Sequence, residues 1–174
     1  MCTQEERESI IAEITVAFEG VPKPAPTMEA ILQFGDFMTK EFLSEIAGMD
    51  WQDMLKRLER SVTETTRIDW AKICYNHWAI MTIPAAVYYT PALLIHALNP
   101  AAVDIADSMS QYLVTDTIVT PKSTDGAPQW PLRVDTYTQK QKRAYALAVF
   151  CMSDIDPDFF DTCEGMRDFY LKML

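Results

Sequence analysis

The sequence predicts an all-α protein, and three observations favour that fold class. Apolar residues recur at helical spacing along most of the chain. Thr and Asp residues precede several of these segments, at positions where they would cap helices. Only 5 of the 174 residues are glycine, which leaves little material for tight hairpins. The length and the 49% hydrophobic content are typical of a single domain over residues 1–174, and we expect a bundle of about six to eight helices.

The N-terminal segment predicts an amphipathic helix with a marked start and end. Thr3 and Glu6 have the spacing of a capping box, in which a hydroxyl and a carboxylate satisfy backbone donors reciprocally. Gly20 and the proline-rich stretch 21–26 end the helix, and the stretch is expected to be a stiff connector. The residues predicted for the buried face are Ile10, Ile11, Ile14, Ala17 and Phe18.

Two further helices are predicted before residue 63. Thr27 is expected to cap one helix that runs to a stop at Gly48. Its apolar face would consist of Ile31, Phe34, Met38, Phe42 and Ile46. Asp50 is expected to cap the next helix. The residues predicted to face inward there are Trp51, Met54, Leu55, Leu58 and Val62.

The middle of the chain, residues 73–103, contains no Asp, Glu, Lys or Arg. Part of it is long enough to span a bilayer, but two prolines interrupt it and neither flank carries a basic cluster. We therefore expect a buried central layer of helices, the first of them over residues 70–81. Pro84 suits the first turn of the following helix, whereas Pro91 should break or kink it. Asn99-Pro100 closes the unit.

The remaining sequence predicts three shorter helices and one long loop. A helix over residues 101–113 precedes an irregular stretch at residues 116–136, which contains three prolines. Thr138 is expected to cap a helix from Gln139 to about Met152. A final helical segment is predicted over residues 159–174.

Two blocks of the sequence carry a pattern, IPAAVYYTPALL at residues 83–94 and YTQKQKRAYALAVF at residues 137–150. Aromatic residues precede a Pro-Ala-Leu run, and a Thr-x-x-Gln helix opening with an apolar pair follows. The residues concerned are Tyr88, Tyr89, Pro91, Ala92, Leu93, Thr138, Gln141, Val149 and Phe150. This pattern resembles a bacterial all-helical domain family of unknown function. The resemblance implies a helical fold and brings no activity with it.

The net charge and the cysteines indicate the cellular compartment and the class of partner. The formal net charge of −10 argues against nucleic-acid binding and favours a protein partner with a basic surface. The four cysteines lack the spacing of a disulfide framework, so reduced thiols are expected. The charged N-terminus lacks the apolar region of a secretory signal. These features predict a cytoplasmic protein that does not enter membranes.

Metal and cofactor sites are not expected. The most suggestive carboxylates are Asp154, Asp156 and Asp158, which alternate as at the start of a calcium loop. The sixth position of such a loop is Phe159 and the twelfth is Gly165, where the loop needs glycine and glutamate. Cys74 and His77 could share a zinc ion on a helix, but no second ligand pair accompanies them.

Catalytic arrangements are equally sparse. Cys74 or Cys151 could pair with His77 or His96 as a nucleophile and its base, yet the sequence has no nucleophile elbow. The carboxylates of the 101–113 helix could hold Mg²⁺, but no Lys or Arg lies between residues 72 and 122 to bind phosphates. An enzyme whose site is assembled from distant segments is an alternative that remains open.

Binding residues are predicted in the C-terminal half. Trp130 lies in the long loop between two prolines, where a tryptophan can anchor an interface. The acidic residues predicted to contact a partner with it are Asp154, Asp156, Asp158 and Asp161. They belong to a wider set of acids near both chain ends through which binding is expected to run, and the other members are Glu5, Glu6, Glu8, Glu13, Glu164 and Asp168. We expect a module that binds and neutralises another protein, as immunity proteins and phage-encoded inhibitors do. An enzyme with a dispersed metal or thiol site and a scaffold or regulatory subunit are the alternatives. The sequence does not define the oligomeric state.

Overall fold

The computed structural model describes residues 2–32, 37–61, 81–100, 136–155 and 170–174. These residues form six helices, which confirms the predicted all-α class. The helices are α1 (Gln4–Ala17), α2 (Met28–Ile31), α3 (Phe37–Ile46), α4 (Trp51–Ser61), α6 (Ile83–Ala97) and α8 (Gln139–Ile155). The described residues contain no strand, only an isolated antiparallel bridge between Leu32 and Met81. No helix within these ranges is long and apolar enough to cross a membrane.

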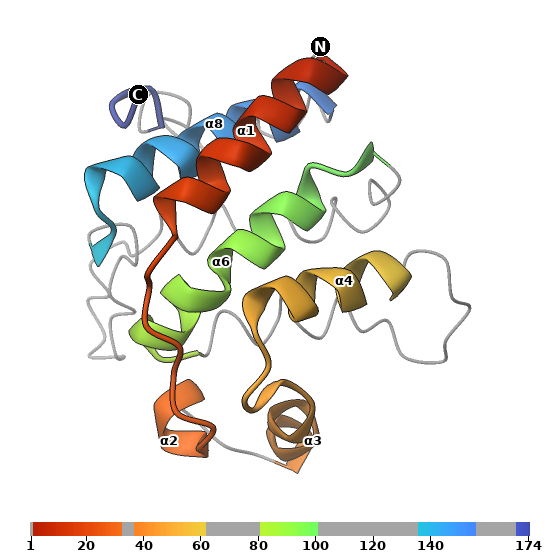
Figure 1. Cartoon of the computed structure of the whole chain (residues 1–174), viewed down its shortest axis with the longest axis vertical. Coiled ribbons are helices and arrows are strands. Elements are labelled where there is room, and N and C mark those ends of the chain that lie inside the picture. The colour runs from red at the N-terminus through yellow and green to blue at the C-terminus, as the bar shows by residue number, and fades with distance from the viewer. Residues whose placement is uncertain (1, 33–36, 62–80, 101–135, 156–169) are drawn as a thin grey trace, which may run out of the picture.

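Helix α6 lies at the centre of the described structure. It contacts α1 and α8 on one side and α2 and α4 on the other (Figure 1). Residues 88–98 are all buried, which confirms the predicted burial for this part of the uncharged stretch. A charged side chain at any position from 88 to 98 would have to give up its water, at a cost of several kcal/mol. The absence of charge in the sequence therefore follows from the position of this helix.

Proline affects α6 less than the sequence suggests. Pro84 lies in the first turn as predicted, and the Thr82 hydroxyl caps that turn by accepting from the Ala85 N–H. Of the break or kink predicted at Pro91, the break is wrong, because α6 runs through this residue to Ala97. Pro91 is itself buried, and packing from both sides holds the helix together despite the lost backbone hydrogen bond.

The predicted helix from Thr27 to Gly48 is divided in two. Thr27 caps α2 as predicted, but α2 ends at Ile31 and Leu32 is extended. The carbonyl of Ile31 accepts the Thr82 N–H at 2.8 Å, and the hydroxyl of Thr82 donates to the Ala30 carbonyl at 2.6 Å. These long-range bonds engage the backbone carbonyls at the end of α2. The apolar periodicity of residues 27–48 contains no signal for contacts with a residue so far along the chain.

The end of α3 and the start of α4 match the prediction in position. Gly48 follows α3 with φ of +77°, a conformation that glycine adopts without strain. Asp50 precedes α4, and its carbonyl accepts the Met54 N–H at 3.0 Å. Its carboxylate does not act as the expected cap. It accepts instead from the ammonium of Lys23 at 2.9 Å and the hydroxyl of Tyr88 at 3.0 Å.

This carboxylate joins the 21–26 connector to α6, and the pKa values reflect the contacts. The hydrogen bond from Lys23 is the main cause that lowers the pKa of Asp50, and the bond from Tyr88 adds to it. Burial is the main cause that raises the pKa of Tyr88, and the neighbouring Asp50 carboxylate raises it further. Asp50 is therefore an ionised acceptor at neutral pH, and Tyr88 is a neutral donor.

The amphipathic pattern of α1 and α4 predicted their buried residues. In α1, Ile14 and its C-cap Phe18 are buried, and the other predicted residues of that face pack partly against the core. In α4, Trp51, Met54 and Leu58 are buried. Val62 and the other residues predicted between Thr63 and Ile80 lie outside the described residues.

Several predicted segments cannot be compared with the structure because they fall outside the described ranges. They are the helix over residues 70–80, the helix over residues 101–113, residues 116–135 of the long loop, and residues 159–169. Met81, the last residue of the first of these, belongs to the bridge with Leu32 and is not helical. Tyr170 and Leu171 are helical, as the final predicted segment requires.

Tyr89 fastens α6 to the turn between α3 and α4. Its buried hydroxyl donates toward the carbonyls of Ile46 at 3.1 Å and Met49 at 3.2 Å. Burial, the largest cause, raises the pKa of Tyr89 well above its ordinary value, so the donor proton is retained. One residue further on, the hydroxyls of Thr90 and Tyr137 are 2.8 Å apart and join α6 to the start of α8.

Replacing Tyr89 with phenylalanine should lower the free energy of unfolding by about 1–2 kcal/mol, because a buried hydrogen bond is lost while the ring remains. Tyr88→Phe is the matched control. Its lost partner, Asp50, has a side chain that is 57% exposed, so water replaces the bond and the loss should be under about 1 kcal/mol. Urea unfolding measures both values, and equal losses would contradict the assigned role of Tyr89.

Candidate functional site

The structure describes none of the side chains in the C-terminal half that were predicted to bind a partner. Trp130, Asp156, Asp158 and Asp161 lie outside the described residues. Asp154 lies in the last turn of α8, which extends to Ile155, but its side chain is not among those described. The interface predicted from Trp130 and these acids therefore stays a prediction.

A different site is formed between α1 and α8, which lie side by side (Figure 1). A cavity of about 600 Å³ lies there, which we call the α1–α8 groove. Its lining residues are Cys2, Glu6, Ser9, Ile10, Glu13, Arg143, Leu147, Phe150, Cys151 and Ser153. Partly buried apolar side chains contact the core beneath it, and polar side chains line its walls. This combination is typical of a binding site.

Helical spacing positions the residues of both walls. Glu6, Ser9, Ile10 and Glu13 follow one another at intervals of three, one and three residues and so share one face of α1. On α8, Arg143, Leu147, Phe150 and Cys151 follow one another at intervals of four, three and one residues, which also place them on one face of the helix. Reciprocal capping boxes start both helices. Thr3 and Glu6 make the first, and Thr138 and Gln141 make the second.

An ion pair connects the two helices at the Arg143 end of the groove. The guanidinium of Arg143 is 2.9 Å from the carboxylate of Glu13, and both side chains are partly exposed. The same guanidinium donates to the backbone carbonyl of Leu174 at 3.3 Å. A pair this accessible to water contributes little to stability. Its main consequence is to set the charge of this end of the groove.

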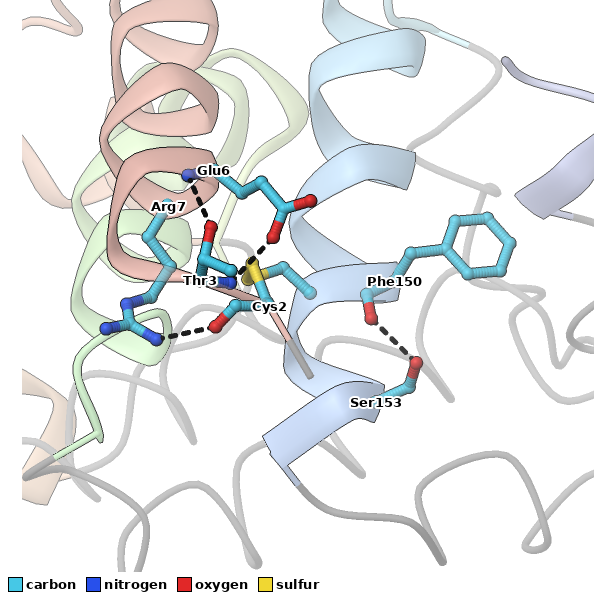
Figure 2. The surroundings of a disulfide bond; sticks show 7 residues. Cys2, Thr3, Glu6, Arg7, Phe150 and Ser153 are labelled. Atoms are coloured by element: carbon cyan, nitrogen blue, oxygen red, sulfur yellow. Dashed lines mark hydrogen bonds between the residues drawn. A yellow bond between two sulfur atoms is a disulfide. The ribbon is translucent and has the colours of Figure 1, made fainter.

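Glu6 provides a second negative charge in the groove. Its carboxylate accepts the Thr3 backbone N–H at 2.7 Å (Figure 2). This bond is the first cause that lowers the pKa of Glu6 below its ordinary value of 4.5. Glu6 is therefore ionised at neutral pH. Glu5 and Glu8 are exposed on the same helix, so α1 presents an acidic surface to solvent.

A disulfide bond between Cys2 and Cys151 closes the other end of the groove (Figure 2). The two Cα atoms are 5.3 Å apart, and the residues are 7% and 3% exposed. The expectation that all cysteines are reduced is wrong for this pair. The two residues are 149 positions apart in the sequence, so only the packing of α1 on α8 reveals that they meet. Cys74 and Cys163 lie outside the described residues.

The disulfide also changes the chemistry considered from the sequence. Cys151 is not a thiol in this state, so it cannot act as the nucleophile of a Cys–His pair. His96 is fully buried in α6. Cys74 and His77 are outside the described ranges. Among the described side chains, no group of three or more His, Cys, Asp or Glu residues could hold a metal ion.

The groove was not predicted as a site, although Glu6 and Glu13 were among the acids expected to take part in binding. The amphipathic pattern of α1 and the cap at Thr138 were both predicted, and they belong to the helices that form the two walls. What the sequence could not supply is the pairing of a helix near residue 10 with one near residue 147. Cys2, just before α1, and Cys151, near the end of α8, could have indicated that the two helices pack together. That inference required the assumption that the two cysteines form a disulfide bond.

Comparison with known proteins gives no relative to which a function could be traced. No protein-family model, no curated protein and no solved structure matches the chain significantly. The resemblance to a bacterial helical family stays a prediction.

Removing the disulfide should destabilise the protein. The chain-entropy model gives about 5 kcal/mol for a closed loop of this length, and measured losses are commonly about 2–5 kcal/mol. The test is urea unfolding of the wild type and Cys2→Ser, each with and without a reductant. Reductant should lower the unfolding midpoint of the wild type and leave that of Cys2→Ser unchanged. A wild-type midpoint indifferent to reductant would contradict the prediction.

Glu6 should contribute to acid sensitivity. Because its pKa is lower in the folded state, its contribution to stability is present above the ordinary value of 4.5 and is lost as pH falls through the folded pKa. Glu6→Gln can still accept the capping bond but does not titrate. Its stability should fall less steeply than that of the wild type in acid, as measured by urea unfolding across a pH series. Glu5→Gln, on the same turn but outside the capping box, should keep the wild-type slope.

Proposed function

We propose that this protein is a protein-binding module that neutralises its partner, and that a basic segment of the partner docks in the α1–α8 groove. The observation that carries the proposal is the groove itself, whose lining combines the acidic side chains of Glu6 and Glu13 with apolar side chains. A role of the immunity or phage-inhibitor type is the form of the proposal that we favour, and a cytoplasmic location is part of it.

The groove suits the side chains of a bound segment. Its volume of about 600 Å³ falls within the range in which proteins enclose ligands. Ile10, Leu147 and Phe150 offer apolar contact, and Glu6 and Glu13 offer acceptors for Lys or Arg. A partner arginine would compete with Arg143 for Glu13, and that exchange replaces one exposed ion pair with another.

The charge of the whole chain supports a basic partner. The net charge of −10 and the glutamates of α1 attract a positive surface over distances of about one Debye length, roughly 8–10 Å in physiological salt. Such attraction raises the association rate more than it raises the final affinity. Binding should therefore become slower with added salt while the apolar contacts keep part of the affinity.

The test begins with identification of the partner by affinity capture and continues with purified components only. We expect Ser9→Trp to weaken binding at least tenfold, because the new side chain fills the groove from an exposed position on its wall. Gln52→Trp places the same side chain on the exposed face of α4 and should bind like wild type. Calorimetry or surface plasmon resonance gives both dissociation constants.

Charge is tested by a second matched pair. Glu13→Gln should lower the association rate and flatten its dependence on salt, because it removes an acidic group of the groove. Glu59→Gln removes the same charge from the exposed surface of α4 and should have a smaller effect. Equal effects of the two variants would mean that the net charge of the protein, and not the acidic groups of the groove, sets the association rate.

The interface predicted from the sequence gives the competing outcome. Trp130→Ala should cost about 2 kcal/mol or more if Trp130 anchors the partner. If Trp130→Ala and an Asp154/Asp156/Asp158→Asn variant weaken binding while Ser9→Trp does not, the partner binds elsewhere and the groove proposal fails. If no protein binds the purified chain, the alternative that the protein is an enzyme is favoured.

A further inference from the structure

We infer that the Cys2–Cys151 disulfide is a reducible latch on the α1–α8 groove, which a thiol entering the groove opens by thiol–disulfide exchange, and that opening it reduces partner binding. The inference deepens the proposed function by naming the regulation of that site, and the binding part of it rests on that function. The exchange itself does not depend on the partner.

The position of the disulfide carries the inference. Both cysteines line the groove, although both are largely shielded from bulk solvent. Figure 2 shows the bond between them, which lies between the start of α1 and α8. A thiol bound in the groove therefore lies next to the disulfide.

The two cysteines differ as leaving groups. Cys2 directly precedes Thr3, the N-cap of α1, so it lies at the positive end of the helix dipole. The guanidinium of Arg7 donates to the backbone carbonyl of Cys2 at 2.9 Å and adds a nearby positive charge. Both features favour a thiolate. Cys151 lies within α8, only four residues before its end at Ile155, where the dipole disfavours negative charge.

The exchange follows from this asymmetry. The thiolate of a low-molecular-weight thiol attacks the Sγ atom of Cys151, the bond between the two cysteines breaks, and Cys2 leaves as a thiolate that then takes up a proton. A second molecule of the thiol, as its thiolate, attacks the sulfur of the first and releases Cys151 as a thiolate, which is protonated in turn. Overall, two thiols are oxidised to one disulfide and the protein gains two electrons and two protons.

Opening the latch affects one wall of the groove. At the Cys2 end, the covalent bond joins the first turn of α1 to α8. At the other end, the connection is the exposed pair of Glu13 and Arg143, which is weak by itself. Without the disulfide, the first turn of α1 can move away from α8, and the acidic wall with Glu6 and Ser9 loses its fixed position.

The first experiment follows exchange without any partner. The oxidised full chain is mixed with glutathione as the probe thiol, quenched with an alkylating agent and digested, and the modified peptides are identified by mass spectrometry. Ser9→Trp should slow the exchange at least fivefold relative to Gln52→Trp, because it obstructs the groove. The first mixed disulfide should form on Cys151. Equal rates in the two variants, or a mixed disulfide formed first on Cys2, would overturn the route.

The second experiment asks what reduction changes. Amide hydrogen exchange in residues 4–13 should become at least tenfold faster in the reduced protein, whereas residues 88–98 of α6 should lose protection only to the extent that the global free energy of unfolding falls. The purified partner should bind the reduced wild type and Cys2→Ser at least tenfold more weakly than the oxidised wild type.

The outcomes separate the latch from the proposed function. Unchanged hydrogen exchange in residues 4–13, or equal partner affinity of the oxidised and reduced forms, overturns the latch and leaves groove binding intact. Failure of the partner to bind the oxidised form overturns the proposed function, and the hydrogen-exchange result still decides whether the disulfide controls α1.

Discussion

The burial of α6 is the constraint on which the rest of the structure depends. This helix packs against four others, and the residues from Tyr88 to Leu98 are withdrawn from water. Two of its buried hydroxyl groups have specific partners in the surrounding elements. Tyr89 bonds the turn after α3, and Thr90 bonds Tyr137 at the start of α8. The surrounding elements are positioned by these contacts as well as by apolar packing, and α1 and α8 meet over one side of α6.

Local signals in the sequence predicted the described helices well, because their causes are local. The capping boxes at Thr3 and Thr138 and the stop at Gly48 depend on residues within one or two turns. The failures have distant causes. The helix after Thr27 ends early because Thr82 bonds its last carbonyls, and α6 passes Pro91 because neighbours on several sides enclose it. A periodic pattern contains no information on such contacts.

In the candidate site, too, the local features were predicted and the long-range contacts were not. Each wall of the groove lies on a helix that the sequence predicted, down to the cap that starts it. The groove exists because the two helices pack together, and the disulfide exists for the same reason. Composition suggested four reduced thiols, whereas the positions of Cys2 and Cys151 at the ends of packed helices bring their Cα atoms within 5.3 Å. Cysteine spacing along the chain is thus a weak guide when helices far apart in the sequence are neighbours.

The ion pair and the disulfide bond that connect α1 to α8 at the two ends of the groove respond to different conditions. The exposed pair of Glu13 and Arg143 responds to salt and to a competing charge, whereas the disulfide responds to the thiols around it. Neither connection involves the interior of α6, where the hydrogen bonds of Tyr89 lie. The proposed latch therefore acts on the groove and not on the hydrogen bonds of Tyr89. Such a separation between a stable centre and a responsive surface is what a protein needs if its binding is to follow the redox state of its surroundings.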